Sequence, residues 1–152
     1  MNSRFAVSVH ILTVLGSRTG QLLTSETIAG QVNTNPAVVR KLVGALQKAG
    51  LVCSKLGPGG GLSLAINPSG ISLACVYTAL KEDDSNLLLP EHTKSPNCEF
   101  AYGVLASLEN SCGKAEQALQ TVLRQTTIAD VLADARAGIP QSHLELQSAR
   151  LP

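Results

Sequence analysis

The chain has 152 residues, among them no Trp, two Tyr and two Phe, so we expect one main domain whose core is aliphatic. No stretch approaches the roughly 18 consecutive apolar residues of a membrane span, and no small-residue cleavage site follows the apolar stretch from Phe5. These features exclude a membrane-spanning class and predict a cytoplasmic protein. Irregular spacing of the four cysteines predicts free thiols rather than a disulfide framework: Cys53, Cys75, Cys98 and Cys112.

The net charge of +1 conceals an uneven distribution along the chain. Residues 1–66 hold six basic residues and one acidic residue, a net charge of +5, whereas residues 67–152 hold six basic and ten acidic residues, a net charge of −4. Short segments also vary in charge by chance. The basic part coincides with the helical pattern described next, so we interpret the asymmetry as the footprint of a polyanionic partner.

Two helices close together follow a first helix that begins at Ser3. The pattern predicts one helix over Ser25–Val32 and another over Pro36–Ala49, separated by a turn of three residues. Asn35 followed by Pro36 is a strong helix start, because Asn caps a free N–H and Pro at the first position lacks the N–H that would stay unpaired. Gly50 is placed as a C-terminal stop. Helix, tight turn and helix in this order are typical of a helix-turn-helix.

A β-hairpin is predicted directly after these helices. Two apolar runs, Leu51–Leu56 and Leu62–Ile66, flank the turn Gly57-Pro58-Gly59-Gly60-Gly61, whose glycines suit the positive φ angles of such a turn. The expected fold is therefore mainly α with a small β-hairpin wing: a winged helix-turn-helix domain over residues 1–80. This architecture predicts double-stranded DNA as a partner and a location at the nucleoid.

The rest of the chain is predicted to form a short helix over Ile71–Leu80, a loop over residues 81–98, dimerisation helices over residues 99–135 and a disordered tail over residues 136–152. The last predicted helix starts at Thr127 with Asp130 as its capping partner. The long helix Phe100–Leu123 carries an apolar stripe that a small winged domain alone cannot cover, so we expect a homodimer. The alternative is an intramolecular hairpin with Ile71–Leu80. The stripe consists of Val104, Leu108, Cys112, Ala115, Leu119 and Val122.

Four segments together resemble the Rrf2 family of bacterial winged helix-turn-helix regulators: MNSRFAVSVHIL, NPAVVRKLVGALQKAGLVCSKLGPGGGLSLA, ISLACVYTAL and QTTIADVL. The family includes the iron–sulfur regulator IscR, the nitric-oxide sensor NsrR and the cysteine-metabolism repressor CymR, and the segment SPNC is most similar to a YwnA-like branch. The resemblance implies a dimer that binds inverted-repeat operators, usually as a repressor. Cluster-binding members carry three cysteines between the winged domain and the long helix, where this chain has only Cys98. We therefore expect no iron–sulfur cluster, and the scattered His10, His92 and His143 predict no metal site.

The exposed side of the Pro36 helix is expected to enter the major groove. Arg40 suits a bidentate contact to a guanine edge, which Lys41 can only approximate as a point charge. Asn35 either contacts a base or only caps the helix. Lys55 is expected to contact phosphate from the wing. At the next position, immediately before the glycine-rich turn, many relatives have an Arg where this chain has Leu56. The full set of expected DNA-contacting residues is Thr24, Ser25, Asn35, Ala37, Arg40, Lys41, Lys55, Gly57 and Gly59.

Other functions are less well supported by the sequence. Cys98, just before the long helix, is either a thiol with a lowered pKa that senses redox state or an inert buried thiol. Cys53 and Cys75 fall on apolar faces and are expected to be packing residues. No Ser/His/Asp or paired-carboxylate arrangement predicts an enzyme. The alternative function is a winged-helix protein-interaction module without DNA binding, against which the cationic pair Arg40-Lys41 argues.

Overall fold

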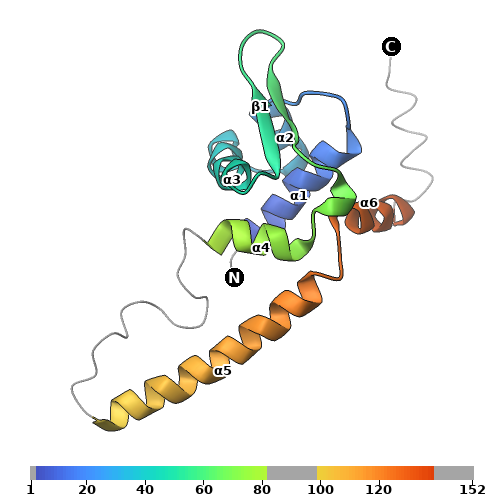
Figure 1. The fold of residues 1–152 in the computed structure, drawn as a ribbon. Coiled ribbons are helices and arrows are strands. Elements are labelled where there is room, and N and C mark those ends of the chain that lie inside the picture. The colour runs from blue at the N-terminus through green and yellow to red at the C-terminus, as the bar shows by residue number, and fades with distance from the viewer. Residues whose placement is uncertain (1–2, 82–98, 139–152) are drawn as a thin grey trace.

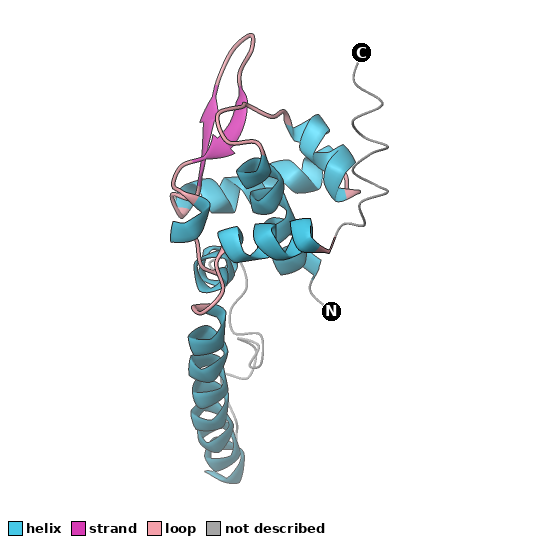
Figure 2. Ribbon diagram, turned by 90° about the vertical axis from the view of Figure 1, so that its right-hand side faces the viewer, coloured by secondary structure: helices cyan, strands magenta, loops and turns pink. Residues whose placement is uncertain are grey.

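The computed structural model describes residues 3–81 and 99–138. Its elements, in chain order, are α1 (Ser3–Ser17), α2 (Ser25–Val32), α3 (Pro36–Lys48), β1 (Val52–Lys55), β2 (Gly61–Leu64), the 3-10 turn η1 (Pro68–Gly70), α4 (Leu73–Lys81), α5 (Glu99–Leu123) and α6 (Ile128–Ala137). Figures 1 and 2 show the β1–β2 wing and α5 projecting toward opposite ends of the molecule, with the other helices clustered between them. None of the helices in the described part of the chain is long and apolar enough to span a membrane.

The helix-turn-helix forms where the sequence predicts it. Thr24 caps α2 by accepting a hydrogen bond from the backbone N–H of Thr27 (3.2 Å), and Asn35 caps α3 by accepting one from Ala37 N (2.7 Å). The turn between the helices contains Asn33 in the left-handed region, at φ 55°. α3 ends at Lys48, followed by Gly50 at φ 72°. These caps fix the angle at which the chain enters each helix.

The predicted hairpin is also present. β1 and β2 pair antiparallel with Val52 opposite Leu64 and Lys55 opposite Gly61. The turn between them contains Gly57 at φ 91° and Gly59 at φ 72°, which L side chains rarely adopt. The base of the wing is tied to the segment before α2, because Leu23 and Leu62 exchange two backbone hydrogen bonds of 3.0 and 2.8 Å. The wing is therefore held in a fixed place beside α2 and α3.

The fold class predicted from the sequence is confirmed: a mainly helical chain with a two-stranded wing. The core is aliphatic and joins α1, α2, α3, α4 and α6. Its fully buried hydrophobic side chains include Ile11, Leu12, Ile28, Val39, Leu46, Ile71, Val76 and Ile128.

The start of α4 differs from the prediction, which began this helix at Ile71. Ile71 and Ser72 are instead extended against residues 126–128: Leu73 N donates to Thr126 O (2.9 Å) and Ile128 N donates to Ile71 O (2.8 Å). A pairing between segments more than 50 residues apart thus replaces the first two residues of the predicted helix.

α6 begins with the predicted capping box, in which Thr127 and Asp130 each cap the other's backbone N–H. It packs against α1 and buries Ile128 and Leu132 in the core shared with α1–α4. The prediction grouped this helix with the dimerisation helices of residues 99–135, but its apolar face completes the N-terminal domain of its own chain. α6 also continues to Ala137, so the first residues of the predicted disordered tail are helical. The remainder of that tail and the predicted loop 82–98 lie outside the described residues.

α5 contacts its own domain mainly through α4. Glu116 accepts hydrogen bonds from Tyr77 Oη (3.0 Å) and Lys81 Nζ (2.8 Å). The Tyr77 ring in turn packs edge-on against Phe5 of α1, with ring centroids 6.3 Å apart. The contact of α5 with the domain thus includes a polar cluster around Glu116. Of the predicted apolar stripe, Cys112 is half-buried, and the other five residues, Val104, Leu108, Ala115, Leu119 and Val122, are exposed in the single chain.

Candidate nucleic-acid interface

Helix α3 has one buried side and one exposed side. Val39, Leu42, Val43 and Leu46 are buried, whereas Lys41 and Lys48 are exposed. The N-terminal half of the exposed side consists of Ala37, Val38, Arg40 and Lys41. Val38, which is 41% exposed, is not among the DNA-contacting residues expected from the sequence. Gly44, one turn after Arg40, is half-buried.

Asn35 and Thr24 both act as helix caps. Asn35 Oδ1 accepts from Ala37 N at 2.7 Å, and Thr24 Oγ1 lies 3.2 Å from Thr27 N and 3.0 Å from Thr27 Oγ1. Both side chains are exposed, and Ser25 is half-buried. The side-chain oxygens of the two caps are thus already occupied by the protein's own backbone, which leaves the Asn35 amide N–H groups free for another partner.

Arg40 lies in an ion pair that the sequence did not reveal. Its Nη1 is 3.0 Å from Glu26 Oε1 on α2, with side-chain exposures of 59% and 65%. The pKa of the Glu26 carboxyl lies below its usual range, mainly because the carboxylate accepts a hydrogen bond from the backbone N–H of Glu26 itself. The charge of Arg40 and a hydrogen bond from Thr24 lower this pKa further. The start of α2, where Thr24 and Ser25 are expected to contact DNA, therefore already holds a carboxylate of the protein.

The wing presents one cation and one large apolar side chain. Lys55 is exposed at the end of β1, and Leu56 is 91% exposed at the start of the turn. Gly57 and Gly59 are exposed at the turn itself, where they leave the backbone open. A side chain at Gly60 would overlap the carbonyl oxygen of Lys55, so the close approach within the turn also requires a glycine there. The wing thus offers a lysine, backbone amides and a leucine to whatever lies beside α3.

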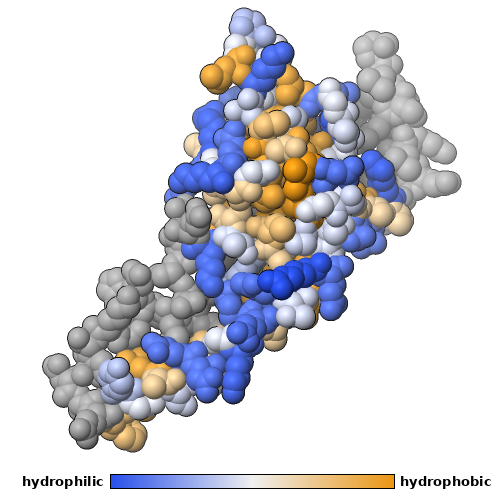
Figure 3. Space-filling view, viewed as in Figure 1, coloured by the Kyte–Doolittle hydropathy of each residue, from blue (hydrophilic) through white to orange (hydrophobic). Residues whose placement is uncertain are grey.

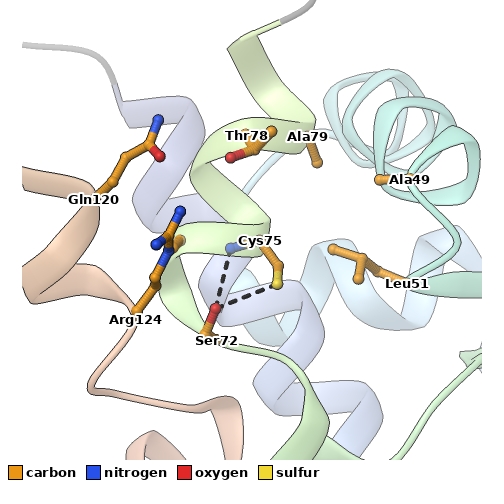
Figure 4. Close-up of a pocket in the computed structure, with 9 residues that line it drawn as sticks. Ala49, Leu51, Ser72, Cys75, Thr78, Ala79, Gln120 and Arg124 are labelled. Atoms are coloured by element: carbon orange, nitrogen blue, oxygen red, sulfur yellow. Dashed lines mark hydrogen bonds between the residues drawn. The ribbon is translucent and has the colours of Figure 1, made fainter. Parts of the chain in front are cut away.

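The surface away from this interface contains a cleft of about 430 Å³ where the end of α3, α4 and the end of α5 meet. In Figure 4, Gln120 and Arg124 extend from α5 toward α4, where Ser72 accepts a hydrogen bond from Cys75 N (3.3 Å) and lies 3.2 Å from Cys75 Sγ. The cleft's residues offer no histidine or carboxylate for acid–base chemistry. Figure 3 shows an apolar area below the wing on the visible face of the N-terminal domain, while polar residues cover most of the visible side of α5.

The described cysteines lie on three separate elements. Cys53 on β1 and Cys75 on α4 are exposed, which corrects their assignment as packing residues: both lie on a side of their element that faces away from the core. Cys112 is half-buried on α5, and Cys98, the expected redox residue, lies outside the described residues. Within residues 3–81 and 99–138, no three His, Cys, Asp or Glu side chains group closely enough to hold a metal ion. These residues therefore do not fit an iron–sulfur cluster.

Comparison with known proteins explains the arrangement. Residues 1–134 match the family model Rrf2, described as an iron-dependent transcriptional regulator. The chain is 33% identical over 132 residues to the candidate HTH-type transcriptional regulator YwnA of Bacillus subtilis (strain 168), covering 87% of this chain and 96% of YwnA.

Solved structures have the same fold. A crystal structure of a candidate DNA-binding protein superposes with a TM-score of 0.69 at 32% identity, covering 86% of this chain and 99% of the other. IscR of T. potens superposes with a TM-score of 0.65 at 23% identity over 95% of each chain, a likeness of fold alone. The family match over nearly the whole chain, together with the winged helix-turn-helix geometry, shows that this protein belongs to the Rrf2 family of transcriptional regulators.

Proposed function

We propose that this protein is a sequence-specific DNA-binding repressor that acts as a homodimer on an inverted-repeat operator. The observation that carries the proposal is the exposed side of α3, on which Arg40 and Lys41 are both exposed, together with the exposed Lys55 on the wing that follows α3 in the chain. A helix of this kind fits the major groove, and its N-terminal half reaches the base edges. Membership of a family of transcriptional regulators supports the same conclusion.

The roles of the individual residues follow from their chemistry. Arg40 reads a guanine through its planar set of N–H donors, and Lys41 and Lys55 bind phosphates as point charges. Ala37 and Val38 offer apolar contacts to a thymine methyl group. Thr24, Ser25 and Asn35 lie at helix starts next to the backbone of the duplex, and Gly57 and Gly59 allow the wing to approach it closely.

Dimerisation through α5 is supported by the exposure of its apolar stripe. Val104, Leu108 and Leu119 are 45%, 46% and 39% exposed in the single chain, and Val122 is 61% exposed. Such a row of apolar side chains on one helix is typical of a surface that a second protein covers. A two-fold partner would bury the stripes of both protomers and place two α3 helices on the same duplex.

Thiol sensing by Cys98 is a further part of this proposal and rests on its position in the sequence, just before α5. Oxidation with hydrogen peroxide should then weaken operator binding by the native protein and not by the Cys98→Ser variant. Equal sensitivity of the two proteins would assign the response to another thiol, and no sensitivity in either would end the proposal of thiol sensing.

Selection of duplexes from a randomised pool tests the proposed function directly. We expect the native protein to enrich an inverted repeat whose half-sites lie about one helical turn, roughly 34–36 Å, apart or a multiple of that distance. Arg40→Ala should lose the enriched base at one position of each half-site. Failure of the native protein to enrich any sequence would contradict the proposal and favour a protein-interaction module.

A further inference from the structure

Glu26 is the single acidic residue among residues 1–66, and it lies in contact with Arg40. The pair joins the second residue of α2 to the exposed side of α3, with 3.0 Å between Glu26 Oε1 and Arg40 Nη1. Both side chains are more than half exposed, so the pair adds little to the stability of the fold. The pair instead affects how the guanidinium of Arg40 is presented on the exposed side of α3.

The geometry of the guanidinium allows two partners at once. Arginine has five N–H donors in one plane, and Glu26 uses a donor on Nη1. A guanine edge needs two neighbouring donors. The donors that Glu26 does not use are sufficient for this bidentate contact while Glu26 stays bound. Glu26 thus restrains the direction in which the guanidinium of Arg40 points.

The charge of Glu26 acts on a different class of contact. Phosphate binding is electrostatic and independent of sequence, and a carboxylate beside Arg40 offsets its attraction for phosphates. The same carboxylate repels the phosphates that approach the start of α2. A base edge carries no net charge and is therefore much less affected.

We infer that Glu26 is a specificity-determining residue that orients Arg40 for base contact and suppresses its binding to phosphate. This inference deepens the proposed function and rests on it. Glu26 does not itself need to touch a base, so it is a positioning residue of Arg40. The ratio of affinities for specific and random DNA is the quantity that it raises.

Two substitutions separate the charge of Glu26 from its hydrogen bond. Glu26→Gln keeps an acceptor for Arg40 and removes the charge, whereas Glu26→Ala removes both. Glu109→Gln is the matched control, since it neutralises an exposed carboxylate on α5. The probes are a duplex enriched from the randomised pool by the native protein and a random-sequence duplex of the same length.

Glu26→Gln should bind random DNA more tightly, with a slope of log affinity against log salt that is steeper by about 0.9 for each additional phosphate that the protein neutralises. For one additional phosphate, the increase in affinity at 50 mM salt should exceed the increase at 200 mM about threefold. The ratio of the affinity for the enriched duplex to the affinity for random DNA should fall by the same factor by which the affinity for random DNA rises. Glu26→Ala should in addition relax the base preference at the position that Arg40 reads, and this relaxation should vanish in an Arg40→Gln background.

The inference is overturned if Glu26→Gln keeps the native salt slope and affinity ratio, or if Glu109→Gln changes them equally. It is also overturned if Glu26→Ala relaxes base preference as much in the Arg40→Gln background as in the native one. A native protein that enriches no sequence would instead show the proposed function, and with it this inference, to be wrong. These outcomes are distinguishable because the native protein is measured first.

Discussion

Replacing Glu116 with glutamine tests the contact that holds α5 against the rest of its protomer. The Glu116 carboxylate accepts from Lys81 Nζ at 2.8 Å, Tyr77 Oη at 3.0 Å and Gln120 Nε2 at 3.3 Å. A glutamine in the same position has one acceptor oxygen and one NH₂ group, so at least one of these donors must lose its partner. The perturbation therefore removes a charge and a hydrogen bond without changing the volume of the side chain.

The magnitude follows from the exposure of the cluster. Hydrogen bonds to charged groups contribute about 1.5–3 kcal/mol, but the side chains of Lys81 and Glu116 are 35% and 18% exposed, and screening by water reduces the effect to about 1 kcal/mol. For a chain of this size, that loss lowers the Tm by about 2–4 °C. Glu109→Gln, on the same helix without a partner among the described residues, should leave the Tm unchanged.

The difference should also depend on pH. The hydrogen bond from Lys81 is the main cause that holds the pKa of Glu116 below its ordinary value of 4.5, with Tyr77 and Gln120 adding to it. Because the pKa of Glu116 is lower in the folded than in the unfolded state, its ionisation stabilises the fold fully at pH values above the unfolded-state pKa. This stabilisation is lost as the pH falls through the folded-state pKa. Thermal unfolding followed by circular dichroism should therefore separate native protein from Glu116→Gln near pH 7 and much less near pH 3. An equal difference at both pH values would refute the electrostatic account of this contact.

Three further predictions concern the dimer seam, the core and the DNA surface. Leu119→Asp should leave a folded protomer, because Leu119 is 39% exposed in the single chain. In sedimentation this variant should be a monomer, whereas the control Gln117→Asp should stay dimeric. A tight Leu119→Asp dimer would place the dimer interface elsewhere. Ile128→Ala should cost about 2–5 kcal/mol in urea unfolding because Ile128 is fully buried, and a cost below about 1 kcal/mol would mean that α6 is not part of the core. Arg40→Ala should relax base preference at a cost of about 1–3 kcal/mol, whereas Lys55→Ala should weaken binding to all sequences alike; equal losses on specific and random DNA for both variants would contradict the assigned roles.

The features that the sequence predicts well are those with local causes. Asn35-Pro36, Gly50 and the Thr127–Asp130 pair each determine a helix end through neighbours within four residues, and all three act in the structure as predicted. The glycine-rich turn of the wing is local in the same sense. Amphipathic periodicity likewise predicts which side of α3 is buried.

The features that the sequence does not predict depend on contacts between distant segments. The first two residues of the helix predicted from Ile71 pair instead with residues 126–128, and the Tyr77–Glu116 hydrogen bond joins residues 39 apart. The Glu26–Arg40 pair depends on the angle between α2 and α3, which no periodicity encodes. For these features, residue type indicates what a side chain can bind but not which partner lies within reach.

The salt dependence of binding to the enriched duplex tests the central claim most directly. A dimer that brings Lys41 and Lys55 of both protomers to phosphates neutralises about four of them, so log affinity should fall linearly with log salt with a slope of about −3.6, and affinity should drop roughly 10²-fold between 50 and 200 mM. An affinity that stays constant across this range would contradict the account, because no helix presenting these cations to a duplex could be insensitive to salt.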